Sequence, residues 1–128
     1  MSGETISIIV PAFNIATWLP RSLDSLLAQT YKNLEIIVVD DGSADNVREV
    51  LAEYTEKHPN IKAIHKENGG VTSARLRGIR EASGNWIGFM DGDDYVEPQM
   101  YARLLENALT VGAEIAHCGH QILFSDGR

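Results

Sequence analysis

Short runs of apolar, often β-branched residues alternate along the chain with longer segments whose apolar residues recur at helical spacing. Such alternation is typical of βαβ units, which build a largely parallel sheet. Strands are expected at Ile6–Val10, Glu35–Val39, Ile61–Ile64, Trp86–Met90 and Glu114–Cys118. Helices are expected between them, at about residues 19–27, 44–57, 72–82 and 98–111. The pattern therefore predicts one α/β domain.

Several local features refine the expected helices. Thr17 is placed to cap the first helix with its hydroxyl. In the third helix Ala74, Gly78 and Ala82 share a face, which predicts close packing against the sheet. Gly84 follows that helix and suits a left-handed stop.

Polar clusters follow three of the predicted strands, each at the carboxyl end. They are Pro-Ala-Phe-Asn at 11–14, Asp-Asp-Gly-Ser at 40–43 and Asp-Gly-Asp-Asp at 91–94. One such cluster is as compatible with a solvated turn or a helix cap as with a binding site. Ligands of open α/β sheets bind at this edge, so three clusters together predict a shared crevice.

The acidic cluster Asp91, Asp93 and Asp94 predicts a cation site. Three carboxylates within four residues repel one another unless a cation or solvent offsets their charge. Mg²⁺ and Mn²⁺ favour carboxylate oxygens, and Mg²⁺ typically adds substrate phosphates as ligands. A calcium EF-hand loop is excluded, because its sixth and twelfth positions are Val96 and Ala102 instead of glycine and glutamate.

Among the other residues at this edge, Asp41 suits recognition of a base, and the rest allow two interpretations each. Asp41 can accept a hydrogen bond from a nucleobase N–H. Phe13 can stack on that base or fill the core below the loop. Ser43 and Asp45 can cap the second helix or contact a ligand. Arg75 can meet a phosphate beside the preceding glycine pair, or form an ion pair with the acidic cluster.

Composition narrows the function classes. The 128 residues are 44% apolar and 23% charged, as in a soluble globular domain, and carry a net charge of −7. That charge argues against a nucleic-acid partner but permits a nucleotide neutralised by a metal. Cys118 is the only cysteine, which excludes an intramolecular disulfide. Without a leader-like segment or an apolar run of about 20 residues, we expect a cytoplasmic chain lacking a membrane anchor.

The motifs in combination resemble the family 2 glycosyltransferases. They are Val-Pro-Ala-Phe-Asn at 10–14, Val-Asp-Asp-Gly-Ser-Ala-Asp at 39–45, Asn-Gly-Gly at 68–70 with Ala-Arg at 74–75, and Phe-Met-Asp-Gly-Asp-Asp at 89–94 with Pro98. The resemblance implies a truncated GT-A fold, a Rossmann-like three-layer α/β/α sandwich. It also implies transfer of a sugar from a nucleoside-diphosphate sugar to an acceptor hydroxyl, with inversion and with Mg²⁺ or Mn²⁺.

The resemblance also assigns residues. Asp41 would contact the base, and Asp91 and Asp93 match the Asp-X-Asp signature that holds metal and ribose. Leu76 departs from the family, which often has asparagine there. The implied nucleotide-sugar site is Pro11, Phe13, Asn14, Asp41, Arg75, Asp91 and Gly92, and the implied metal site is Asp91, Asp93 and Asp94.

The resemblance leaves the acceptor side without residues. Family members carry a general-base Asp or Glu in an acceptor half, and nothing after residue 118 matches it. We therefore expect residues 1–128 to be the donor-binding part, with the base beyond residue 128. The expected partners are a nucleoside-diphosphate sugar and a glycan or lipid-linked acceptor. Uridine is the first expectation for the base by family habit, with guanosine and thymidine as alternatives. By analogy, the setting is cell-envelope polysaccharide synthesis at the inner face of a membrane, with peripheral association of the full enzyme.

Two other classes also use such folds. A receiver-like regulatory domain places acidic pairs around Mg²⁺, but its first strand ends in acids, whereas Pro-Ala-Phe-Asn follows here. A sugar nucleotidyltransferase usually has a glycine-rich basic loop at that point, which this chain lacks.

Overall fold

Strands and helices alternate along the chain in the order that the hydrophobic pattern predicts. The structure, a computed structural model, describes residues 3–111, 115–118 and 121–125. The strands are β1 (Ile6–Ala12), β2 (Leu34–Asp41), β3 (Ile61–Lys66), β4 (Trp86–Phe89), β5 (Ile115–Cys118) and β6 (Gln121–Ser125). The helices are α1 (Leu19–Leu27), α2 (Val47–Lys57), α3 (Val71–Glu81) and α4 (Met100–Val111).

One sheet joins the described strands in the order β3-β2-β1-β4-β6-β5. The pairs β1–β2, β1–β4 and β2–β3 are parallel, whereas β6 runs antiparallel to both β4 and β5. The prediction of a mostly parallel sheet is confirmed. In the order 3-2-1-4 the winding direction reverses between β1 and β4, and doubly wound sheets bind ligands at the carboxyl ends of such strands.

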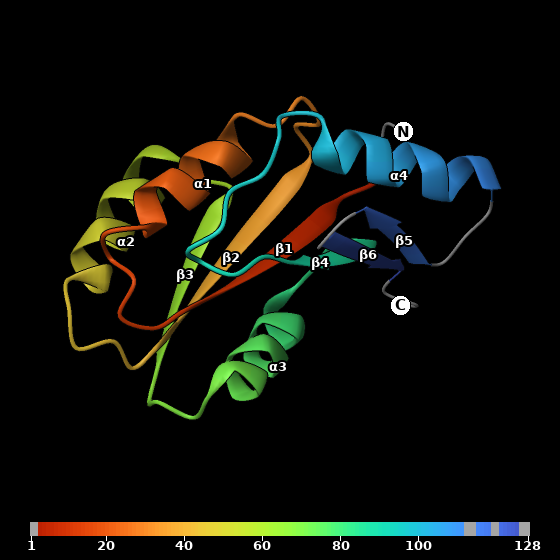
Figure 1. Cartoon of the computed structure of the whole chain (residues 1–128). Helices are drawn as coiled ribbons and strands as arrows, with labels where there is room; N and C mark the ends of the chain where they lie inside the picture. Colours follow the sequence, from red (N-terminus) through yellow and green to blue (C-terminus); the bar gives the residue numbers. More distant parts are fainter. Residues whose placement is uncertain (1–2, 112–114, 119–120, 126–128) are drawn as a thin grey trace.

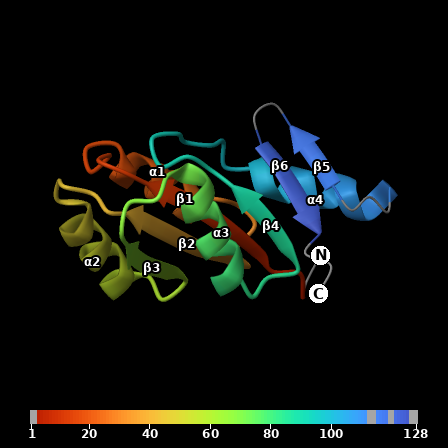
Figure 2. The same ribbon diagram turned by 90° about the horizontal axis from the view of Figure 1, so that it is seen from below.

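Helices cover both faces of the sheet. Figure 1 shows α1, α2 and α4 on one face and α3 on the other, and Figure 2 views the molecule from the α3 side. Alternate residues of β1 supply the two cores, as the two-residue period of a strand requires. The larger core includes Ile6, Ile8 and Val10 with leucines of α1, α2 and α4, and the smaller core joins Ile9, Ile37 and Val39 to Ala74 and Ala82.

The small-residue face of α3 lies directly on the sheet, as predicted. Ala74 and Gly78 are buried, and a Cβ added to Gly78 would lie 2.4 Å from Cγ2 of Ile9. Real Cβ atoms essentially never approach so closely, so glycine is what allows the helix this distance from β1.

Four details of the sequence interpretation change. The N-cap of α1 is Trp18 without a side-chain hydrogen bond, so the Thr17 cap is wrong. The C-cap of α3 is Ala82, whose backbone is extended, so Gly84 is not a left-handed stop of this helix. A Cβ added to Gly84 would lie 2.6 Å from Ser7 Oγ. Helix α2 begins at Val47, three residues later than expected. Strand β6 was not predicted, and Glu114 of the predicted fifth strand lies outside the described residues.

Candidate functional site

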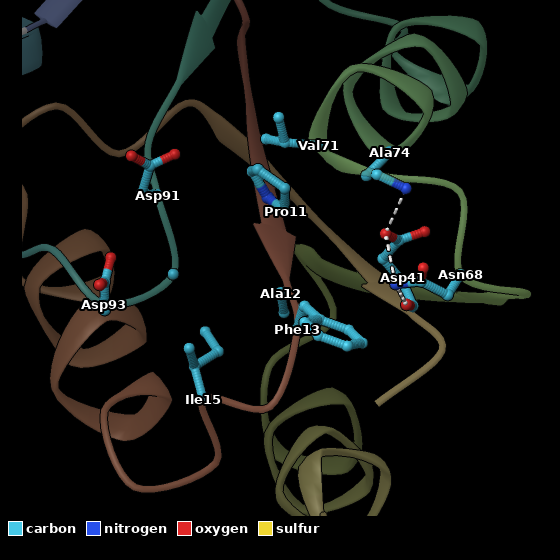
Figure 3. Close-up of a pocket in the computed structure, with 12 residues that line it drawn as sticks. Pro11, Ala12, Phe13, Ile15, Asp41, Asn68, Val71, Ala74, Asp91 and Asp93 are labelled. Atoms are coloured by element: carbon cyan, nitrogen blue, oxygen red, sulfur yellow. Dashed lines mark hydrogen bonds between the residues drawn. The ribbon is translucent and has the colours of Figure 1, made fainter. Parts of the chain in front are cut away.

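A cavity of about 500 Å³ opens at the carboxyl ends of β1 and β2 and below the start of α3. It therefore lies at the edge where the three polar clusters were expected to meet. Its lining combines apolar residues with three carboxylates (Figure 3): Pro11, Ala12, Phe13, Ile15, Asp41, Asn68, Gly70, Val71, Ala74, Asp91, Gly92 and Asp93.

Asp41 and the acidic cluster lie on opposite sides of the end of β1. Figure 3 shows Asp91 and Asp93 on one side, Asp41 on the other, and Pro11 and Phe13 between them. The side chain of Phe13 is 49% exposed, so the alternative of a core aromatic below the loop is wrong. An exposed ring beside Asp41 is available for stacking on a planar ligand.

Asp41 is buried and accepts hydrogen bonds on both carboxylate oxygens. Oδ1 accepts from Lys66 Nζ (2.8 Å) and Gly69 N (3.0 Å), and Oδ2 accepts from Gly70 N (2.9 Å) and Asn68 Nδ2 (3.3 Å). Burial raises the pKa of Asp41, but these donors outweigh it and hold the pKa below its usual value. The carboxylate is thus ionised at neutral pH and fixes the loop that leads into α3.

The acidic cluster is open to solvent. One carboxylate oxygen from each of Asp91, Asp93 and Asp94 lies within 4.8 Å of the others, and all three residues are exposed. Asp91 and Asp93 line the cavity. Asp94 does not, but its carboxylate lies close to those of Asp91 and Asp93. This donor set of hard oxygens fits a divalent cation such as Mg²⁺ or Mn²⁺.

Arg75 lies beside the acidic cluster. Its Nη2 is 3.4 Å from Asp91 Oδ1, so the ion pair considered from the sequence is present. Its guanidinium carbon lies 5.7 Å from the centre of the Phe89 ring. Among the described residues, Arg75 Nε is a buried side-chain nitrogen without a hydrogen-bond partner. A bound anion would satisfy such a donor, although Arg75 does not line the cavity itself.

Asn14, Ser43 and Asp45 connect the loops after β1 and β2. Asn14 adopts a left-handed conformation (φ 53°), its N–H donates to Ser43 Oγ (3.1 Å), and its Oδ1 accepts from Ala44 N (2.7 Å). Asp45 accepts from the N–H of Ala16 (3.0 Å) and of Val47 (3.3 Å), the first residue of α2. The N-cap of α2 is Asn46 without a side-chain hydrogen bond, so neither Ser43 nor Asp45 occupies the capping position that the sequence suggested. None of these three side chains lines the cavity, although Asn14 was expected in the nucleotide site.

The sequence interpretation missed part of the lining. Ile15, Asn68 and Val71 were not among the expected site residues, and Val71 is 50% exposed. The available signal was position, because Asn68 follows β3 at the same edge of the sheet as the three clusters.

The profile of the family described as "Glycosyl transferase family 2" matches residues 7–127. The chain belongs to the family 2 glycosyltransferases. It is 44% identical over 123 residues to the uncharacterized glycosyltransferase EpsJ of Bacillus subtilis (strain 168), covering 96% of this chain and 36% of EpsJ. It is 38% identical over 104 residues to the chondroitin synthase of Pasteurella multocida (strain Pm70), covering 81% of this chain and 11% of that protein.

The fold of this family 2 chain is shared with solved glycosyltransferases. The crystal structure of S. aureus TarS 1–349 in complex with UDP-GlcNAc superposes with a TM-score of 0.80 at 27% identity, over 87% of this chain and 33% of TarS 1–349. The fold is GT-A, as the resemblance implied. The chain spans about a third of EpsJ and of TarS 1–349.

The sheet order excludes one of the two alternatives considered from the sequence. Receiver-like domains wind their sheet in the order 2-1-3-4-5, whereas β1 here lies between β2 and β4. The receiver interpretation is therefore wrong.

Within the described residues, the helices are too short or too polar to cross a bilayer.

Proposed function

We propose that residues 1–128 are the donor-binding part of an inverting, metal-dependent glycosyltransferase that uses a nucleoside-diphosphate sugar, with a UDP-sugar as the first candidate. The observation that carries the proposal is the opposition of Asp41 and Asp93 across one cavity at the carboxyl ends of the strands. One end of this cavity suits a nucleobase and the other a charged diphosphate.

At the Asp41 end, the residues suit a base with an imide or amide N–H. The ionised carboxylate accepts such a proton donor, and the Phe13 ring stacks on the base. Asp41 already accepts from four donors, so the base takes the place of one of them. Lys66 Nζ and Asn68 Nδ2 donate from side chains, which can rotate away, whereas Gly69 and Gly70 donate from the backbone.

At the opposite end, Asp91, Asp93 and Asp94 would hold Mg²⁺ or Mn²⁺ through carboxylate oxygens. When bound, the ion supplies positive charge that stabilises the departing nucleoside diphosphate. Arg75 adds a second positive charge beside Asp91, and its free Nε is a donor for a diphosphate oxygen. Pro11, Val71 and Ala74 add apolar surface to the lining of the same cavity.

The remaining chemistry belongs to the acceptor side. In an inverting reaction the acceptor hydroxyl attacks the anomeric carbon from the face opposite the diphosphate, and a carboxylate removes its proton. We propose that this general base comes from a part of the enzyme outside these 128 residues. The acceptor is a glycan or lipid-linked sugar, and the setting is polysaccharide synthesis on the cytoplasmic side of a membrane. Similarity to a chondroitin synthase supports the polysaccharide setting.

Calorimetric titration tests the proposal. UDP, GDP and dTDP are each titrated into the 128-residue chain with and without Mn²⁺. We expect one nucleotide to bind in a Mn²⁺-dependent manner, with at least tenfold loss in Asp93→Asn and in Asp41→Asn, because each change removes a charge-assisted contact. Glu106→Gln, an exposed change on α4, is the matched control and should bind as the wild type does. Equal binding by all four proteins would refute the proposed site.

A further inference from the structure

Helix α1 and the turn that follows it contact the segment after β4, which includes the acidic loop of residues 91–94, through three polar side chains. Ser22 and Ser25 lie one turn apart on α1, Gln29 lies two residues after the helix ends, and Ser22 and Gln29 are fully buried. All three make hydrogen bonds to the backbone of residues 92–101, which run from the connection after β4 into the first turn of α4. Buried polar groups in such a position are retained only where their hydrogen bonds are made.

Ser22 holds the backbone on both sides of Asp93. Its hydroxyl donates to the carbonyl of Gly92 (2.6 Å) and also lies against the carbonyl of Asp94. A hydroxyl has one proton, so the two carbonyls share it, and both are drawn toward the same point of α1. Arg21, the preceding residue, donates from Nη2 to the carbonyl of Asp93 (3.2 Å) and lies 4.4 Å from the centre of the Tyr95 ring.

Farther along the segment, the other two side chains make equivalent contacts. Val96 N donates to Ser25 Oγ (3.2 Å), outside the acidic cluster. Gln29 donates from Nε2 to the Glu97 carbonyl (2.7 Å) and accepts at Oε1 from Tyr101 N (3.2 Å). The segment is thus attached to α1 and to Gln29 at several points, and among these three side chains Ser22 is the one that contacts the acidic loop.

The acidic cluster needs such an attachment. Oxygens of Asp91, Asp93 and Asp94 lie within 4.8 Å of one another, and their mutual repulsion favours a more open loop. From within the loop and from β1, the Asp94 N–H donates to the Asp91 carbonyl (3.0 Å) and the Gly92 N–H to the Pro11 carbonyl (3.3 Å). Neither bond reaches the carbonyl groups that Ser22 holds.

We propose that Ser22 is a positioning residue, which holds the backbone of Gly92 to Asp94 so that the three carboxylates converge on a divalent cation. This inference rests on the proposed function, because it assumes that the cluster binds the cation. Ser22 itself is buried behind the loop and acts only through the backbone.

The experiment compares Ser22→Ala with Ser25→Ala, the same deletion one turn farther along the same helix. Mn²⁺ alone is titrated and followed by water-proton relaxation, well below the melting temperature of each variant, and Ser22→Cys is added as a near-isosteric second variant. Loss of a hydrogen bond is typically equivalent to about a tenfold change, so we expect Mn²⁺ affinity to fall about tenfold in Ser22→Ala. Ser25→Ala should stay within about twofold of the wild type. Without metal, ¹⁵N relaxation should show increased motion of the Gly92 to Asp94 amides in Ser22→Ala only.

The outcomes separate the two claims. If the wild type binds Mn²⁺ and Ser22→Ala and Ser22→Cys bind it equally well, the positioning role is refuted while the metal site stands. If Ser25→Ala weakens Mn²⁺ as much as Ser22→Ala does, the effect is a general loss of packing, which also refutes the role. If the wild type fails to bind Mn²⁺ with or without nucleotide, the proposed function fails, and this inference fails with it.

Discussion

Glu35 carries a buried carboxylate whose ionised form should contribute to folding stability. It lies on β2, and its oxygens accept from Ser7 Oγ (2.7 Å), Lys62 Nζ (2.6 Å), and both Ser83 N (2.9 Å) and Ser83 Oγ (2.8 Å). Burial alone would raise the pKa of Glu35, but these donors outweigh it and lower the pKa to about 2. The charged carboxylate therefore links Ser83, which follows α3, to Ser7 of β1 and Lys62 of β3.

The lowered pKa converts into stability. The difference between the usual value of 4.5 and about 2 corresponds to about 3 kcal/mol at neutral pH. Lys62 is half exposed and its share is screened by solvent, so we expect Glu35→Gln to cost about 2 kcal/mol. Because the folded-state pKa lies below the unfolded one, this contribution is complete above pH 4.5. It is lost as the pH falls toward 2.

Urea unfolding at pH 7, 4 and 2.5 measures this contribution. The difference between wild type and Glu35→Gln should be about 2 kcal/mol at pH 7 and should shrink steadily at the two lower values. Glu106→Gln, on the exposed face of α4, controls for the general loss of one negative charge. A difference that stays constant from pH 7 to 2.5 would show that the cost of Glu35→Gln does not arise from ionisation, and the reasoning would be refuted.

Two further substitutions test the packing of α3 and the loop that leads into it. Gly78→Ala adds helix propensity of up to about 1 kcal/mol but places a Cβ 2.4 Å from Ile9 Cγ2, so we expect a net loss of about 1–2 kcal/mol in thermal unfolding. Combining it with Ile9→Ala should remove part of that loss, and additive losses would contradict the contact. Asp41→Asn weakens the acceptors of Gly69 N and Gly70 N, so hydrogen exchange of these two amides should accelerate; unchanged exchange would show that the carboxylate does not fix the loop.

Local pattern and topology rules account for most of the fold. The apolar run in β2 is buried along its whole length, and the leucines of α1 face the core, as their spacing predicts. Strand β6 was missed because its apolar run, Ile122 to Phe124, is too short to classify by period, and its pairing with β4 is a long-range contact. The Thr17 cap failed because backbone N–H groups at the start of α1 bond the carbonyl of Ile15 instead.

The sequence predicted at which edge of the sheet the candidate site lies, but not which contacts its residues make. Parallel strands end on one edge, so the convergence of Asp41 and Asp93 follows from element order alone. The position of Asn14 does not, because its bonds to the loop after β2 depend on a left-handed backbone that sequence leaves open. The choice between core and cavity for Phe13 also required the three-dimensional structure, since both suit an aromatic residue after a strand.

The most direct measurement of the central claim uses amide NMR spectra of the chain with Mg²⁺·UDP and then Mn²⁺·UDP. The account predicts that Mg²⁺·UDP shifts the amide signals of Phe13, Asp41 and Gly70, which line the base end of the cavity. Mn²⁺·UDP should broaden the signals of Gly92 to Asp94 beyond detection while those of α2 stay sharp. Shifts and broadening confined to another surface, or broadening at Gly92 to Asp94 without any shift at Asp41, would contradict a single site that joins nucleotide and cation.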